Sequence, residues 1–133
     1  MISAQAVIDT NFFVSGLINP YGPPGQLLDA LLNRSLTIAY DDRLLGEYRE
    51  ILQRPRFHFD PKHLKEVFDI MLFQNRVSAA PWPFAPSPDP DDTMFLEVAT
   101  AAAAPLISGN LRHFPMDCRG PVIVLTPAEF LSR

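Results

Sequence analysis

The sequence has a single cysteine and no excess of basic side chains. Cys118 alone excludes an intramolecular disulfide and a thiolate cluster for zinc within one chain. The formal net charge of −4 argues against a protein that coats nucleic acid by bulk electrostatics, because that mode needs a surplus of Lys and Arg. The negative charge does not exclude an enzyme that acts on phosphate groups, because carboxylates around divalent cations are largely neutralised once the metal binds.

Long apolar segments are also absent. No uninterrupted apolar stretch reaches membrane-spanning length, and the first residues, Met1 to Gln5, lack the basic start and apolar stretch of a signal peptide. We therefore expect a cytoplasmic protein with no membrane partner. Because 47% of the 133 residues are hydrophobic, the chain has enough apolar material for one core, and we expect a single domain over 1–133.

Apolar runs alternate with helix-start signals along the chain. The expected strands are 5–9, 36–40, 77–80, 105–108 and 122–125, and the expected helices are about 26–33, 42–52, 61–76, 91–103 and a last one from 127. Five prolines between Pro81 and Pro90 exclude a central strand or helix there and predict an extended loop. This order, with connections long enough for crossovers, favours an α/β fold with a mainly parallel sheet and helices on both faces.

Acidic residues stand where these elements meet. Asp9 closes an apolar strand, and ligands collect at the carboxyl ends of parallel strands in open α/β sheets. Helical phase, at about 100° per residue, puts Glu47 at the border of a buried face and Asp92 beside an apolar stripe, whereas Glu97 points away. With the acidic cluster at 89–92, these residues predict a metal site.

Each acid also has an ordinary structural explanation. Asp9 could end its strand in an Asx turn, Glu47 could be a solvated helix residue, and Asp89 with Asp92 match the N-cap and N3 positions of a capping box. The clustering of the acids favours a functional role, because three carboxylates within four residues are more than one helix cap needs. His113 could contact phosphate or donate a proton, but a lone loop histidine is more often solvated, so it stays outside the predicted catalytic set.

The chain resembles the PIN domain family, and within it the VapC-type toxins. The resemblance covers nearly the whole length and rests on the order and spacing of VIDTNFFVS at 7–15, EYREIL at 47–52, DPDD at 89–92, LISGN at 106–110 and TPAEFL at 126–131. It implies a three-layer α/β/α fold whose acids bind Mg²⁺ or Mn²⁺ and hydrolyse phosphodiester bonds, usually in RNA. On this basis we predict a metal-dependent endoribonuclease that is the toxin of a type II toxin–antitoxin pair and forms a homodimer.

Carried over position by position, Asp9, Glu47 and Asp92 match three acids of the family's site and are the predicted catalytic residues and metal ligands. Because Mg²⁺ keeps several waters and takes one or two carboxylates directly, we expect Asp9 to bind the metal and the other two to bind it or its waters. Asn110 departs from the family, which commonly has Asp there, although its carbonyl oxygen could still bind a metal. The residues that could compensate for Asn110 are Asp89, Asp91 and Asp117. Those expected to support the site are Thr10, Asn11, Ser108 and Asp89, and those expected to contact phosphate are Arg49 and Arg112.

Other functions explain these residues less well. A phosphoryl-receiver domain needs a late lysine, but Lys65 is the last one in the chain. A haloacid-dehalogenase-type phosphatase needs a second Asp where Asn11 stands. The alternative that remains is a PIN-fold module, weakened in catalysis by Asn110, that binds RNA or an antitoxin without cleavage. The apolar stripe in 68–73 belongs to the core or to a dimer or antitoxin groove. Trp82 has the same alternative explanations.

Overall fold

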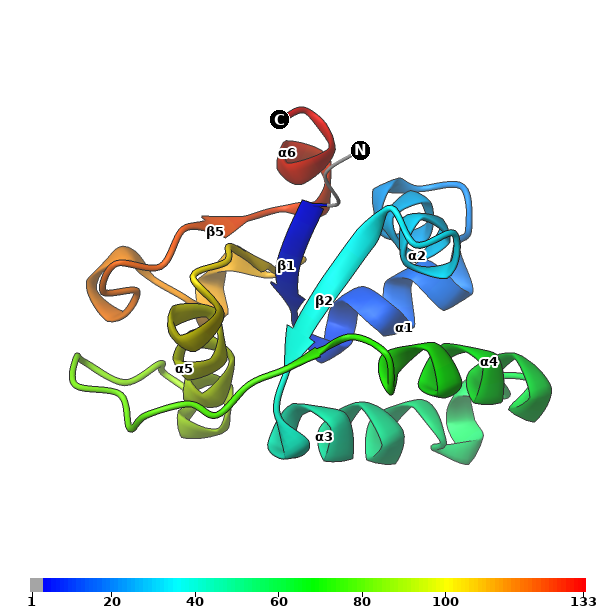
Figure 1. The fold of residues 1–133 in the computed structure, drawn as a ribbon, viewed down its shortest axis with the longest axis horizontal. Coiled ribbons are helices and arrows are strands. Elements are labelled where there is room, and N and C mark those ends of the chain that lie inside the picture. Colours follow the sequence, from blue (N-terminus) through cyan, green and yellow to red (C-terminus); the bar gives the residue numbers. More distant parts are fainter. Residues whose placement is uncertain (1–3) are drawn as a thin grey trace.

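A five-stranded parallel sheet lies at the centre of the computed structural model, which describes residues 4–133 (Figure 1). The first three residues of the segment Met1 to Gln5, used above for the signal-peptide expectation, lie outside the described residues. All neighbouring strands pair in parallel in the order β3-β2-β1-β4-β5, so their carboxyl ends share one edge of the sheet. The strands are β1 (Ala4–Ile8), β2 (Leu36–Tyr40), β3 (Asn75–Arg76), β4 (Leu106–Ile107) and β5 (Val124–Leu125).

Helices cover both faces of this sheet. Helix α5 packs against β1, β2 and β4, while α2 packs against β2 and against helices α1 and α6, and Figure 1 shows α5 on one side of β1 and β2 and helices α1 and α2 on the other. This confirms the predicted three-layer α/β/α architecture. No helix formed by residues 4–133 is long and apolar enough to cross a membrane. The α-helices are α1 (Thr10–Ile18), α2 (Pro23–Leu32), α3 (Asp42–Leu52), α4 (Pro61–Met71), α5 (Thr93–Ala102) and α6 (Pro127–Leu131).

The core is built around the two central strands. Val7, Ile8 and Ile38 are completely buried, as expected for parallel strands covered on both faces, which therefore appear in the sequence as continuous apolar runs. Tyr48 of α3 is also completely buried, and its hydroxyl donates a hydrogen bond to the carbonyl oxygen of Ile8. This bond fixes α3 against the end of β1, where Asp9 follows.

The expected elements leave residues 10–25 as a connection, but Thr10 begins helix α1 there. This segment is mostly apolar, and its exposed polar residues Asn11 and Ser15 give only a weak helical pattern. Helix α1 packs closely on α2 at Gly16, where a Cβ would lie 3.0 Å from the carbonyl oxygen of Pro24. A side chain at this crossing would force its neighbours to move by a few tenths of an ångström, so glycine suits the position.

Several other predicted boundaries shift. The edge strand expected at 77–80 lies instead at Asn75–Arg76, because α4 ends at Met71 rather than near residue 76. Strand β3 pairs with the end of β2, and its register is extended by the Val77 N–H, which donates to the Tyr40 carbonyl oxygen at 2.8 Å. The proline segment is an extended loop as predicted, ending in the 3₁₀ helix η2 (Pro90–Asp92), so that α5 begins two residues later than expected.

Candidate functional site

Asp9 is held at the carboxyl end of β1 by hydrogen bonds to both carboxylate oxygens. Oδ1 accepts the N–H of Phe12 at 3.0 Å as the N-cap of α1, and Oδ2 accepts the hydroxyl of Ser108. Asp9 is only 5% exposed, and burial raises the pKa of its carboxyl although both hydrogen bonds act in the opposite direction. Asp9 therefore caps a helix, which the sequence does not predict, and the cap occupies one oxygen only.

Ser108 follows β4, the strand that pairs with β1. Its buried hydroxyl donates to Asp9 and accepts the N–H of Asn110 at 3.0 Å. The same hydroxyl therefore contacts an acid and bonds its own turn. Because an ionised carboxylate can only accept, the bond to Asp9 uses the single hydrogen of this hydroxyl, and a lone pair of the oxygen accepts from the turn.

Glu47 reaches the same edge of the sheet from α3. The Thr10 hydroxyl donates to Glu47 Oε2, so the residue directly after Asp9 orients the second predicted acid. The charge of Glu47 also contributes to the raised pKa of Asp9. The two carboxylates are therefore close enough to repel each other electrostatically.

Asp92 ends η2 and makes no capping bond. Asp89 caps η2 by accepting the N–H of Asp91 at 3.0 Å, and α5 has no side-chain cap, so the capping box considered from the sequence does not form. Asp92 Oδ2 is buried without a hydrogen-bond partner. His113 Nδ1 lies 3.1 Å from this oxygen, within ion-pair distance but without hydrogen-bond geometry.

Electrostatics links Asp92 to the other two acids. The pKa of Asp92 is raised to about 6, mainly by burial; the charges of Asp89, Glu47 and Asp9 also raise it, while the charge of His113 lowers it. The three predicted acids thus come together from β1, α3 and η2. His113, which is outside the predicted catalytic set, lies beside Asp92. This contact joins two separate segments of the folded chain, so a local sequence pattern could not predict it.

The donor set suits a hard divalent cation. Among residues 4–133, no three His, Cys, Asp or Glu side chains are arranged to enclose a metal ion by themselves. Mg²⁺ does not need such a cage, because it keeps several waters and binds one or two carboxylates directly. Asp92 Oδ2, buried and without a hydrogen bond, is available to it, and a cation would offset both the burial and the mutual repulsion of the carboxylates.

The other predicted residues are placed in different ways. The Asn110 side-chain oxygen accepts the N–H of Arg112 at 3.2 Å and so caps the 3₁₀ helix η3 (Leu111–His113). Arg49 lies over the Phe68 ring, with 5.8 Å from guanidinium carbon to ring centroid, and it is two positions from Glu47, about 200° around the helix. Arg49 is therefore not brought to the acids. The predicted residues that are exposed are Asn11, Arg49, Asp89, Asp91, Arg112 and Asp117.

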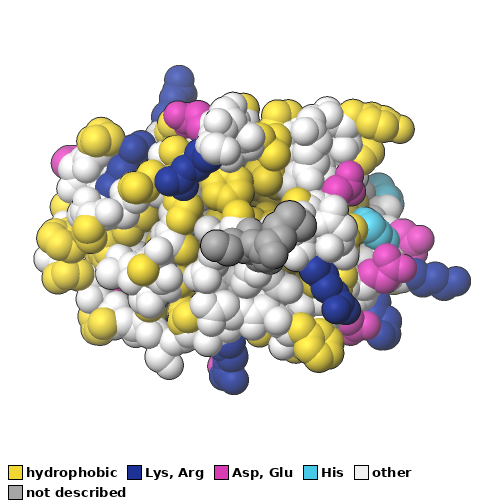
Figure 2. Space-filling model, turned by 45° about the horizontal axis from the view of Figure 1, so that its top comes forward, with side chains coloured by type: hydrophobic (Ala, Val, Ile, Leu, Met, Phe, Trp, Pro, Cys, Tyr) yellow, Lys and Arg dark blue, Asp and Glu magenta, His cyan; other side chains and the backbone are white. Residues whose placement is uncertain are grey.

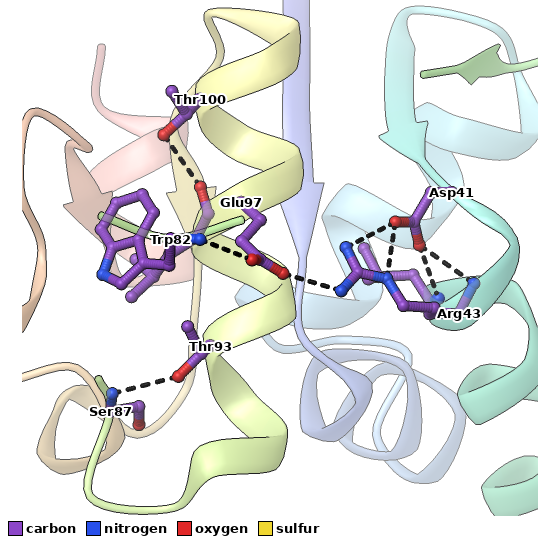
Figure 3. Close-up of polar contacts among 9 residues, drawn as sticks. Asp41, Arg43, Trp82, Ser87, Thr93, Glu97 and Thr100 are labelled. Carbon is purple, nitrogen blue, oxygen red and sulfur yellow. Dashed lines mark hydrogen bonds and ion pairs between the residues drawn. The ribbon is translucent and has the colours of Figure 1, made fainter. Parts of the chain in front are cut away.

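Sequence reasoning missed an ion network beside these acids (Figure 3). Asp41, at the end of β2, caps α3 and accepts from Arg43 Nη2 at 2.8 Å, and Arg43 Nη1 donates to Glu97 Oε1 at 2.7 Å. Glu97 Oε2 accepts the N–H of Trp82 at 2.8 Å. The expectation that Glu97 points away is therefore wrong: its side chain is only 12% exposed and ties α5 to the proline loop. Asp41 had the same strand-end signal as Asp9.

Basic side chains do not gather into one field on the face shown in Figure 2, where Lys and Arg lie apart from one another. This agrees with the net charge of −4. A polyanion on such a surface gains little from bulk electrostatics. Binding of a phosphate group at the acids would require a cation between them.

Comparison with known proteins adds independent information. The PIN domain family matches residues 5–112. Over 112 residues the chain is 30% identical to an uncharacterized protein of Methanocaldococcus jannaschii, an alignment that covers 82% of this chain and 72% of that protein. No solved structure matches. PIN domains are generally metal-dependent nucleases, and this chain belongs to the PIN domain family.

Proposed function

We propose that this PIN domain is a Mg²⁺- or Mn²⁺-dependent endoribonuclease and the toxin of a type II toxin–antitoxin pair. The observation that carries the proposal is the convergence of Asp9, Glu47 and Asp92, with one oxygen of Asp92 buried without a hydrogen bond. Burying a carboxylate oxygen without a hydrogen bond costs free energy. Such perturbed acids cluster at functional sites, and a divalent cation is the partner that this arrangement suits.

The chain's own residues prepare the site in three ways. Ser108 and the Phe12 N–H fix the Asp9 carboxylate, and Thr10 fixes Glu47, so that these oxygens would hold the metal without having to reorganise. A bound cation would neutralise the acids and polarise the phosphodiester group for attack by water. His113, 3.1 Å from Asp92, can hold a proton at Nδ1 close to where the leaving oxygen would depart.

The antitoxin and the homodimer are proposed for a different surface. In the predicted apolar stripe, Phe68 and Met71 are buried, but Leu72 and Phe73 are exposed at the end of α4. A separate cleft of about 370 Å³ between α3 and α4 is lined by apolar residues such as Leu52 and Phe68 and by charged residues such as Arg49 and Lys65. Exposed apolar side chains and a partly apolar cleft on the same helix support a protein partner.

A second candidate is a binding module without cleavage. It is favoured by Asn110, which replaces the acid common in the family and commits its side-chain oxygen to capping η3. In that case RNA or antitoxin binding would not require an intact metal site. An Asp9→Asn variant would then bind its partner as well as the unchanged protein does.

RNA cleavage in Mg²⁺, Mn²⁺ or EDTA tests the proposal. We expect cleavage that depends on metal, is lost in Asp9→Asn and Glu47→Gln, and is retained in the matched control Glu50→Gln, which removes an exposed acid from the same helix. Mn²⁺ titration should show binding that Asp9→Asn weakens. Cleavage that persists in EDTA or in Asp9→Asn would contradict a metal-dependent mechanism that uses Asp9. Growth arrest on expression, absent with Asp9→Asn, would support the toxin role.

A further inference from the structure

A surface cavity opens beside the predicted acids, between the proline loop and α5. Its volume of about 670 Å³ lies within the range of small-molecule sites. Acidic side chains and two aromatic rings line the same space, although they come from separate parts of the chain. The lining residues that matter are Arg43, Glu47, Trp82, Phe84, Asp91 and Glu97.

The two rings are fixed in place and partly open to solvent. Trp82 and Phe84 pack edge to face with centroids 5.2 Å apart, and the Trp82 indole N–H is satisfied by the Ala85 carbonyl oxygen at 3.1 Å. Phe84 rests on the backbone of Gly120, where a Cβ would lie 2.6 Å from the ring. Phe84 is nevertheless 49% exposed, so a planar group can reach it.

The loop that carries these rings is held rigid. Its prolines restrict the backbone, and the Trp82 N–H is anchored on Glu97 (Figure 3). Ser87 is buried and anchored twice: its N–H donates to the Thr93 hydroxyl at 3.1 Å and its own hydroxyl donates to the His113 carbonyl oxygen. A ligand that stacks on this loop would lose little free energy to ordering it.

Charge decides which part of a nucleotide suits each end of the cavity. Glu47, Asp91 and Glu97 outnumber the single cation Arg43, which is already paired with Asp41 and Glu97. A phosphate is therefore disfavoured except beside a metal held by the acids. A neutral planar group suits the aromatic end, and unpaired nucleobases are recognised in this way, by stacking on aromatic side chains.

We propose that Trp82 and Phe84 form a stacking subsite for an unpaired nucleobase of the RNA, next to the phosphodiester bond that is cut. This inference rests on the proposed ribonuclease function and adds to it a base-binding site formed by the proline loop. A base inside a duplex is already stacked and paired, so it must be extruded before it can enter. Duplex RNA is therefore a poor ligand.

Trp82 is the only tryptophan in the chain, so its fluorescence reports stacking directly. The protein would be titrated in Mg²⁺ with a short 2′-O-methylated oligoribonucleotide, either single-stranded or annealed to its complement. We expect quenching by the single strand only, and a Kd about tenfold weaker in Phe84→Ala. Tyr21→Ala is the matched control, because it removes an aromatic ring that is 88% exposed in the turn between α1 and α2. Trp82→Phe should retain affinity and Trp82→Leu should lose it.

The possible outcomes separate this inference from the function on which it rests. The stacking subsite is wrong if the single strand does not quench Trp82 in the unaltered protein and Phe84→Ala binds RNA with unchanged affinity. Metal-dependent cleavage would still support the ribonuclease in that case. Quenching without any cleavage supports the subsite and overturns the ribonuclease. If Phe84→Ala alters the oligomeric state while RNA affinity is unchanged, the rings belong to a protein interface and the proposal is wrong. Phe84→Leu, which fills the space over Gly120 without a π-face, replaces Phe84→Ala if that variant does not fold.

Discussion

Replacing Asp92 by Asn is expected to stabilise the metal-free protein and to weaken the metal-bound one. Asp92 Oδ2 is buried without a hydrogen bond, so its negative charge opposes folding until a cation arrives. Asn has nearly the same shape and no charge.

The magnitude follows from the pKa of Asp92, which is raised from 3.8 to about 6. At 1.36 kcal/mol per pKa unit this corresponds to about 3 kcal/mol, and since the side chain is 18% exposed, screening by water reduces the expected gain to about 2 kcal/mol. The folded state binds the proton more tightly than the unfolded state. The stability of the unaltered protein therefore falls as the pH rises from 3.8 to about 6, and the full cost applies above that window.

Thermal unfolding in EDTA measures this directly. Near pH 8, Asp92→Asn should unfold about 6–10 °C above the unaltered protein, and the difference should vanish near pH 4, where the carboxyl is neutral. Saturating Mg²⁺ stabilises whichever protein binds it more tightly, so the order of the two proteins should reverse. A lower melting temperature for Asp92→Asn in EDTA at pH 8 would refute the reasoning, because it would mean that the carboxylate has a stabilising partner.

Three further substitutions test the supporting structure. Ser108→Ala removes the hydroxyl that donates to Asp9, and we expect metal affinity to fall about 10–100-fold in a Mn²⁺ titration; unchanged affinity would show that the bond does not orient the acid. Tyr48→Phe leaves the buried Ile8 carbonyl oxygen without its donor and should cost about 1–2 kcal/mol in urea unfolding, whereas an unchanged midpoint would contradict the bond. Ala103→Gly should stabilise by about 0.5–1 kcal/mol, since Ala103 ends α5 at φ 52°, where glycine is less strained; a loss of stability would argue against that geometry.

The central strands could be predicted because burial on both faces makes them continuous apolar runs. Helix α1 could not, because its segment is mostly apolar and its two exposed polar residues, Asn11 and Ser15, give only a weak helical pattern. Strands β3, β4 and β5 have two residues each. Their limits are set by pairing with β2, β1 and β4 rather than by their own sequences.

In the candidate site, too, some features could be predicted from the sequence and others depend on tertiary contacts. Asp9, Glu47 and Asp92 could be named from strand ends, helical phase and family resemblance, although their roles stay predictions. The bond between Arg43 and Glu97 joins residues 54 positions apart and exists because the proline loop covers that face of α5. Helical phase assigned Glu97 to solvent because it contains no information about a covering loop.

The Asp9–Ser108 bond joins residues 99 positions apart in the chain, and this separation has a consequence for the timing of activity. A growing chain contains Asp9 and Glu47 long before Ser108 is made, and the carboxylate of Asp9 gains its second hydrogen bond only when β4 docks beside β1. Such distant contacts form late, because a long loop must close first. A partly synthesised chain would therefore carry the acids without the geometry that orients them, and the acids of a newly made molecule would become oriented only when most of its sequence is present.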